Sequence, residues 1–255
     1  MKGRFFHTAF VALMLLMPMT AMGYSFEVDG IYYNEENGQA IVTHGGVDNY
    51  NGHGQNWYSG VVVIPKEVTY AGKTYPVVAI GDCAFNSCTN LTNIAIPNSV
   101  TKICSWAFAG STGLTSITIP NSVTTIGDYV FNSCTSLASV TFGSGVTMIG
   151  RELFNACSQL KDVYCLAVKP PQFVDHNFGF FYGPNDYYVQ TLHVLPGSVG
   201  AYQSWDAYFW RLFSQILGDA TTDGLDEIGY DFMIAGIYYH VENGQATVTN
   251  NGQTG

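Results

Sequence analysis

Apolar residues recur every 23 residues between about Val78 and Ala167, and this spacing restricts the chain to a small group of folds. Four columns share the spacing: Ile80, Ile103, Ile126 and Ile149; Phe85, Phe108, Phe131 and Phe154; Leu91, Leu114, Leu137 and Leu160; and Ile94, Ile117, Val140 and Val163. A fixed repeat of this length is typical of a solenoid, in which each repeat is one coil stacked on the last. We therefore expect the column residues to point into the interior of their coils.

The local pattern within a repeat predicts two strands and a corner. Alternation of apolar and polar residues from Ile117 to Ile119 is typical of a strand with one buried face. Pro120-Asn121-Ser122 follows as a turn, since Pro cannot donate a ladder hydrogen bond and Asn and Ser bond to their own backbone in turns. Val123–Ile126 reads as the second strand, and the return to the next coil carries Phe131 inward.

The repeat units IAIPNSVTKICSWAFAGSTGL, ITIPNSVTTIGDYVFNSCTSL and VTFGSGVTMIGRELFNACSQL resemble those of the leucine-rich repeat superfamily, and within it the BspA-like group of exported bacterial proteins. The resemblance implies an α/β fold class: a curved solenoid with a parallel β-ladder, short turns or helical returns, and strands predominating. Members of that group are commonly surface or secreted proteins associated with adhesion. The partner implied is an extracellular or cell-surface macromolecule, either a protein or a glycan.

The first 23 residues have the pattern of a secretory signal peptide. Lys2 and Arg4 give a basic start, Ala9–Met19 is almost entirely apolar, and Ala21-Met22-Gly23 offers a cleavage site with small residues. The apolar stretch is shorter than the roughly 20 residues that a spanning helix needs, which argues against a membrane anchor. We expect export, with the protein secreted or on the cell surface and the periplasm as a further option.

A second repetition acts over a longer distance. GIYYNEENGQAIVT (30–43) returns as GIYYHVENGQATVT (236–249) with eleven of fourteen positions identical, and Asn37-Gly38 reads as a type I′ hairpin turn. The second copy predicts the start of another module. Six segments follow: signal peptide 1–23, N-terminal hairpin and loop 24–60, solenoid 61–167, C-terminal cap 168–218, acidic linker 219–233, and a second, incomplete module 234–255.

The C-terminal cap is predicted to be helical. Terminal coils of a solenoid expose an open core and need a cover. Ser198 can cap a helix in which apolar residues fall mostly at helical spacing, namely Tyr202, Trp205, Phe209, Leu212, Phe213 and Ile216. The aromatic run 173–188 before it reads as filler beneath the cap, or alternatively as a patch that stacks on sugar or docks a protein.

Charge excludes two classes of partner. The signal peptide contains two of the nine basic residues and none of the 19 acidic ones, so its removal leaves a net charge of −12. Such a chain repels nucleic acid and anionic lipid, and no basic cluster compensates. No other segment is apolar enough to span a membrane.

Catalytic and metal-binding motifs are missing from the sequence. The six cysteines include no Cys-x-x-Cys pair, which weakens zinc and redox interpretations, and a Cys134–Cys157 bridge is unfavoured because stacked side chains point in parallel. The acidic stretch from Asp219 departs from a calcium loop, because Tyr230 stands where a bidentate Glu is needed. No nucleophile elbow, phosphate loop or zinc-protease motif occurs. We expect no cofactor, no metal and no enzymatic activity.

The candidate binding residues come from the exposed positions of the first strands, where the side chains are short and mostly neutral. They form two columns, Asn93, Ser116, Ser139 and Asp162, and Ala95, Thr118, Thr141 and Tyr164. The site predicted from them comprises Asn93, Ser116, Ser139, Asp162 and Tyr164, with the most varied chemistry at Asp162 and Tyr164. The leading hypothesis is a secreted or surface-exposed protein that mediates protein–protein or cell-surface and matrix adhesion. The alternative is a non-catalytic carbohydrate-binding accessory module of a larger exported protein.

Overall fold

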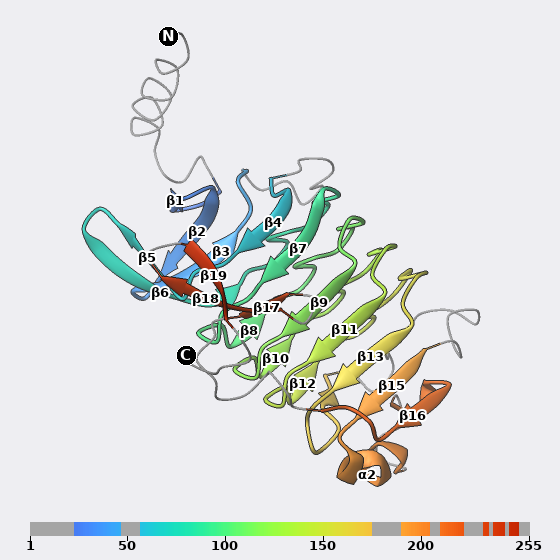
Figure 1. The fold of residues 1–255 in the computed structure, drawn as a ribbon. Coiled ribbons are helices and arrows are strands. Elements are labelled where there is room, and N and C mark those ends of the chain that lie inside the picture. The colour runs from blue at the N-terminus through green and yellow to red at the C-terminus, as the bar shows by residue number, and fades with distance from the viewer. Residues whose placement is uncertain are drawn as a thin grey trace.

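The computed structural model describes residues 23–46, 57–174, 190–204 and 210–221, and the backbone of three strands at 232–234, 237–242 and 245–249. The predicted signal peptide lies outside the described residues, apart from Gly23. Figure 1 shows strands stacked side by side in chain order from the N-terminal hairpin to the short helix near the other end. No helix in the described part of the chain is long and apolar enough to cross a membrane.

A five-stranded parallel sheet spans the later coils and the C-terminal cap and is called the main sheet here. Its strands are β9 (Ser116–Ile119), β11 (Ser139–Phe142), β13 (Asp162–Cys165), β15 (Thr191–Val194) and β16 (Gln215–Leu217). The parallel pair β4 (Gly60–Val63) and β7 (Leu91–Ala95) precedes it. These are the predicted first strands of the coils, so the predicted parallel ladder is confirmed.

The second strand of each coil contributes to another parallel ladder. It contains β6 (Lys73–Ile80), β8 (Lys102–Ile103), β10 (Thr125–Ile126), β12 (Met148–Ile149) and β14 (Gln172–Phe173). Each strand after β6 is only two residues long, because the chain turns back towards the main sheet after each one. The returns are turns and not helices, which decides between the two alternatives that the sequence left open.

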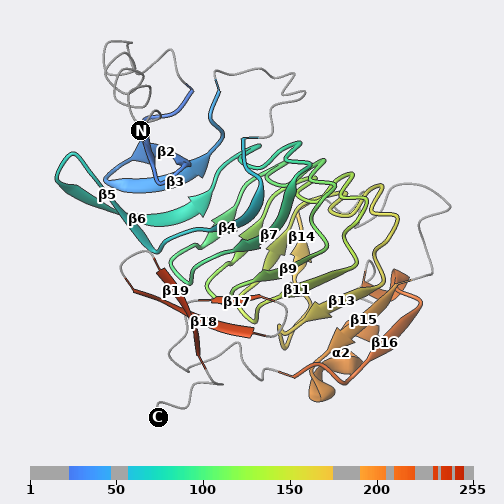
Figure 2. The ribbon, with the colours of Figure 1, turned by 45° about the horizontal axis from the view of Figure 1, so that its top comes forward.

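The N-terminal end is closed by antiparallel strands. The strands β1 (Phe26–Val28), β2 (Ile31–Glu36) and β3 (Gln39–Thr43) form a meander, and β3 pairs in parallel with β6. Asn37 and Gly38 have φ angles of 53° and 82°, as both central residues of a type I′ turn require. The strand β5 (Glu67–Tyr70) forms a hairpin with the start of β6 that extends away from the coils (Figure 2).

The phenylalanine column forms the centre of the core. Phe85, Phe108, Phe131 and Phe154 are at most 1% exposed, as predicted. Their rings stack from coil to coil at centroid distances of 5.1, 5.7 and 5.8 Å, with interplanar angles of 10–13°. The Ile, Leu and Val columns around them are buried as well. Because every coil places the same side chain at the same point, the interior repeats with the coil spacing.

A column of small side chains fastens each return to the preceding coil. Ser111 Oγ donates to the carbonyl oxygen of Phe85 at 2.7 Å, and Cys134 Sγ donates to that of Phe108 at 3.1 Å. Cys157 Sγ repeats the contact with Phe131 at 3.0 Å. Burial raises the pKa of the Cys134 thiol well above its usual value, so the thiol stays protonated and able to donate. All six cysteines lie in the described residues, and no disulfide joins any two of them.

The C-terminal cap differs from the predicted long helix. The helix α2 covers only Val199–Gln203, Ser198 makes no capping hydrogen bond with its side chain, and Ser204 is extended. Ile216 lies in β16 and pairs with Leu192, so its predicted place on a helix is wrong. Ile216 belongs to the last strand of the main sheet. Pairing with β15 is favoured there over the helix that the spacing of apolar residues predicts.

Two polar aromatic residues join this cap to the last complete coil. Tyr202 Oη donates to the carbonyl oxygen of Ala167 at 2.8 Å, and Trp210 Nε1 donates to that of Pro171 at 2.9 Å. The rings of Tyr202 and Trp210 meet edge to face at 5.2 Å. The cap therefore covers apolar surface and also satisfies carbonyl groups that the end of the ladder leaves buried.

The duplicated sequence motif also forms a duplicated structural unit. The strands β17 (Phe232–Ile234), β18 (Ile237–Glu242) and β19 (Gln245–Thr249) form an antiparallel meander. Phe232 pairs with Tyr239 as Phe26 pairs with Tyr33, and the register of the whole unit follows the N-terminal copy.

Replacing Phe131 by Ala is expected to destabilise the protein by about 3–5 kcal/mol, because it opens a cavity between two stacked rings. Urea unfolding followed by circular dichroism measures this loss. The control is Met148→Ala, on an exposed residue of β12, which should change the free energy of unfolding by under about 0.5 kcal/mol. Equal losses in the two variants would contradict the core assignment.

Replacing Tyr202 by Phe is expected to cost about 1–3 kcal/mol, since the buried carbonyl of Ala167 loses its donor while the ring stays in place. Thermal unfolding of the full chain measures the effect, with Tyr70→Phe on the projecting hairpin as the matched control. A variant with unchanged thermal stability would show that the cap is not fastened at this point.

Candidate functional site

The exposed face of the main sheet presents two rows of side chains. Strand pairing aligns the first row through Ser116, Ser139, Asp162, Thr191 and Gln215, and the second through Thr118, Thr141, Tyr164, His193 and Leu217. The predicted residues Ser116, Ser139 and Asp162 are therefore neighbours in a single row. Asn93 occupies the corresponding position on β7, one coil earlier, and Tyr164 belongs to the second row.

The N-terminal part of this face is less accessible than the sequence suggests. Ala95, expected on the exposed face, is 1% exposed, and Asn93 is half-buried. A methyl group projects only a short distance from the sheet, and β17 lies against β7. The sequence prediction is wrong for Ala95. The chemically varied end of the face, at β13 and β15, is the part that offers groups to a partner.

Four side chains meet at that end, and they are called the sheet-end cluster here: Asp162, Tyr164, His193 and Asp219. The ring of His193 stacks on that of Tyr164 at a centroid distance of 4.3 Å and an interplanar angle of 14°. Its Nδ1 lies 2.8 Å from Asp219 Oδ1 and its Nε2 lies 3.2 Å from Asp162 Oδ1. Both nitrogens of one imidazole thus face carboxylates from different parts of the chain.

Exposure within the cluster is uneven. The His193 side chain is only 11% exposed, whereas Asp162 and Asp219 are 42% and 54% exposed. Each ring nitrogen lies within hydrogen-bonding distance of one carboxylate oxygen, and the tautomer sets which nitrogen donates. The histidine acts as a bridge that fixes the two carboxylates, and the carboxylates keep part of their surface open to solvent.

Burial, assisted by the charges of Asp162 and Asp219, raises the pKa of Tyr164 above its usual value. Its hydroxyl therefore remains protonated at neutral pH. The cluster offers one aromatic hydroxyl and two fixed carboxylates over a small area. This is a hydrogen-bonding surface, and no group of His, Cys, Asp and Glu in the described residues is arranged to hold a metal ion.

Sequence reasoning found half of the cluster. Asp162 and Tyr164 were predicted, whereas His193 and Asp219 were not. The signal for His193 was present, because the strand Leu192-His193-Val194 echoes the repeat and puts His193 beside Tyr164. Asp219 was assigned to an acidic linker, yet its neighbour Ala220 donates its backbone N–H to Val194 and holds Asp219 beside the sheet.

The aromatic run 173–188 lies mostly outside the described residues. Phe173, which the structure does describe, is 8% exposed and contacts Trp210 at a ring distance of 6.1 Å. At this one position the residue is filler beneath the cap. The prediction of a sugar-stacking or docking patch falls on residues 175–188, which lie outside the described part of the chain.

Comparisons with solved structures find bacterial proteins, two of which are named as leucine-rich repeat proteins. A leucine-rich repeat protein from T. pallidum is 23% identical, with a TM-score of 0.43, over 73% of this chain and 92% of its own. One from Bacteroides capillosus is 22% identical, with a TM-score of 0.38, over 66% and 96%. The pneumococcal vaccine antigen PcpA is 21% identical, with a TM-score of 0.44, over 68% and 50%. Among curated proteins no sequence matches the chain.

The family comparison agrees with the resemblance seen in the repeat units. The model of the BspA type leucine rich repeat region matches residues 66–169 in six copies. This span contains the strands β5 to β13 and all four phenylalanines of the central column. The chain carries a leucine-rich repeat region of the BspA type.

Proposed function

We propose that the chain is an exported interaction protein that binds an extracellular or cell-surface protein through the sheet-end cluster. The observation that carries the proposal is the cluster itself: one imidazole, with its side chain 11% exposed, lies between two half-exposed carboxylates and stacks on a tyrosine. The rest of the face carries short neutral residues such as Ser116, Ser139 and Thr141. Recognition would concentrate where the side chains are large and preorganised.

The composition of the cluster supports a protein partner. Tyr is enriched at the centres of protein interfaces, because its ring buries a large area and its hydroxyl makes a directional hydrogen bond. Carboxylates that are already fixed lose little conformational entropy on binding. A partner with basic and hydroxyl groups would match Asp162, Asp219 and Tyr164, and the net charge of −12 that remains after removal of residues 1–23 favours such a partner at long range.

Export and surface display are part of the proposal. They are supported by the basic start, apolar stretch and cleavage pattern of residues 1–23. The second hairpin unit, β17 to β19, supports a modular protein in which weak sites act together, because linked sites bind at high effective concentration.

We further propose that the protein binds without turning over a substrate. Within the sheet-end cluster, His193 contacts two carboxylates and one aromatic ring. None of these is a nucleophile–base pair of the kind that acyl or phosphoryl transfer uses. The cluster is suited to holding a partner at a fixed geometry.

The test is a binding screen of residues 24–255 against extracellular-matrix proteins and a glycan array. We expect a protein ligand whose affinity falls about tenfold or more in Tyr164→Ala and in His193→Ala, since each removes one half of the stacked pair. Met148→Ala, an exposed change on β12 outside the main sheet, is the control and should bind as the parent does.

Thermal unfolding of each variant separates lost contacts from lost structure. Ligand binding that survives both substitutions would exclude the sheet-end cluster as the site. Selective binding to glycans alone would favour the carbohydrate-binding alternative. Hydrolysis of a bound ligand by the pure protein, abolished by one substitution, would overturn the non-enzymatic assignment.

A further inference from the structure

The return segments carry a column of residues that the binding face does not use. Cys83, Trp106, Tyr129 and Glu152 occupy equivalent positions in four successive coils, and their φ angles are 55°, 60°, 57° and 49°. This left-handed conformation costs a residue with a side chain about 1–2 kcal/mol, and glycine and asparagine adopt it most easily. The coil geometry requires the conformation, but nothing in it requires an aromatic residue.

Two of these positions nevertheless carry large rings at the surface. Trp106 and Tyr129 stack at a centroid distance of 4.3 Å and an interplanar angle of 17°, and Trp106 is 39% exposed. One face of the indole is covered by Tyr129. The opposite face points towards the preceding coil, where the column residue is the small Cys83. Among the described residues, the column position beyond that face is Cys83, whose side chain is too short to cover an indole ring.

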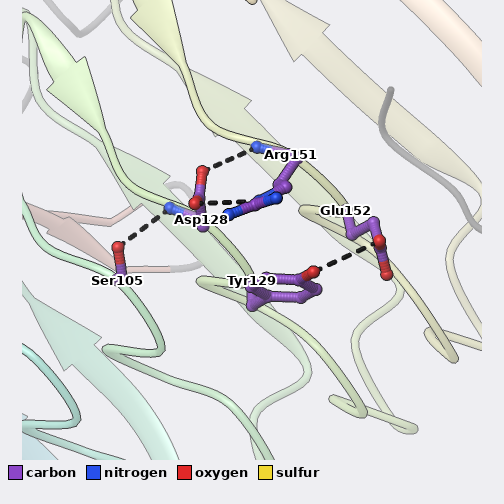
Figure 3. Close-up of polar contacts among 5 residues, drawn as sticks. All are labelled: Ser105, Asp128, Tyr129, Arg151 and Glu152. Atoms are coloured by element: carbon purple, nitrogen blue, oxygen red, sulfur yellow. Dashed lines mark hydrogen bonds and ion pairs between the residues drawn. The ribbon is translucent and has the colours of Figure 1, made fainter. Parts of the chain in front are cut away.

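At the other end of the stack, an arginine of the chain itself lies beside the ring of Tyr129 (Figure 3). The Arg151 guanidinium carbon lies 5.8 Å from the centroid of the Tyr129 ring. Its Nε lies 3.1 Å from Asp128 Oδ2, and Asp128 Oδ1 accepts the backbone N–H of Arg151 at 3.0 Å. An aromatic ring and a carboxylate of one coil thus hold a guanidinium contributed by the next.

The first coil repeats the carboxylate but lacks the cation. Asp82 stands in the column of Asp128, and its Oδ1 accepts the backbone N–H of Ser105 at 2.9 Å, as Asp128 does with Arg151. Residue 105 is a serine, so no guanidinium follows it. Asp82 is exposed, and its bond to Ser105 keeps its carboxylate next to the residue that carries the indole.

We infer that Trp106 and Asp82 form a second binding site, which takes an arginine side chain from a partner protein. The guanidinium would lie on the open face of Trp106, above Cys83, and pair with the Asp82 carboxylate. Planar guanidinium stacks on aromatic faces and is weakly hydrated, so it fits such a position better than an ammonium group does. The inference does not rest on the sheet-end cluster, because Trp106 and Asp82 lie in the return turns and not on the main sheet.

A sugar ring is the competing occupant, because sugars also stack on tryptophan. Two observations favour the cation. The same column already holds a guanidinium at Tyr129, and the carboxylate of Asp82 brings a negative charge to a chain that is itself strongly acidic. A neutral sugar could stack and donate a hydroxyl hydrogen bond to Asp82, but it would gain neither an ion pair nor long-range attraction to an acidic chain.

The experiment measures binding of the full chain to a labelled, end-blocked peptide of alternating arginine and serine by fluorescence anisotropy at low ionic strength. We expect affinity to fall about tenfold in Trp106→Leu, which keeps an apolar group but removes the ring, and to a similar extent in Asp82→Asn. Asparagine can still accept the Ser105 N–H, so Asp82→Asn removes the charge and leaves the turn intact. The lysine analogue of the peptide should bind more weakly than the arginine peptide.

Two control variants test whether binding depends on the proposed site and not on general charge attraction. Glu67→Gln removes an exposed acid on β5 and should leave peptide affinity unchanged. Met148→Ala removes an exposed apolar side chain on β12, outside both proposed sites, and should also leave peptide affinity unchanged. Equal losses of peptide affinity in Glu67→Gln and Asp82→Asn would show that the peptide responds to net charge and not to the proposed site. Unchanged binding in Trp106→Leu, or Trp106-dependent binding of a neutral oligosaccharide in place of the peptide, would overturn the assignment.

Discussion

Hydrogen bonds between equivalent points of successive coils hold this molecule in register. The backbones of the main sheet, the second ladder and the returns all bond one coil ahead or back. Side chains also link successive coils: Asp128 accepts the N–H of Arg151, 23 residues further on, and Ser111 donates to the carbonyl of Phe85, 26 residues back. Inserting or deleting one residue in a coil would break all these contacts together, because a one-residue slip turns a strand's side chains to the other face. The constant repeat length is therefore a physical requirement of the fold.

This requirement explains how much of the fold could be predicted. Inward positions such as Phe131 and Leu137 are visible in the sequence because every coil must bury the same point. The cap was harder, because no second copy of it constrains the pattern. Apolar residues from Tyr202 to Ile216 fit a helical spacing, but Ile216 lies in β16, which pairs with β15. Long-range pairing of this kind leaves no periodic trace.

The candidate site illustrates the same limit. Asp162 and Tyr164 could be predicted because they interrupt columns of serine and threonine. Their partner His193 comes from β15, which the chain reaches only after a segment that breaks the repeat, so the His193–Asp162 contact spans 31 residues. Asp219 follows β16 and is brought back by backbone pairing of Ala220 with Val194. The cluster forms at the end of the repeats. The 23-residue spacing therefore reveals Asp162 and Tyr164, which lie within the repeats, but not His193 and Asp219, which follow them.

Coil stacking also decides what an aromatic residue can do in this fold. Equivalent positions lie one strand spacing apart, which is close to the separation at which rings stack. Aromatic residues that face inward in neighbouring coils therefore become the core, as Phe108 and Phe131 do at 5.7 Å. The same arrangement facing outward gives a rigid platform, as with Trp106 and Tyr129 at 4.3 Å. A platform built in this way needs no loop to order on binding, since the coils already fix both rings. The chemical group that such a platform selects then depends on the neighbouring column, which holds the residue before each column position. That column carries Asp82 at one end of the stack and Arg151 at the other.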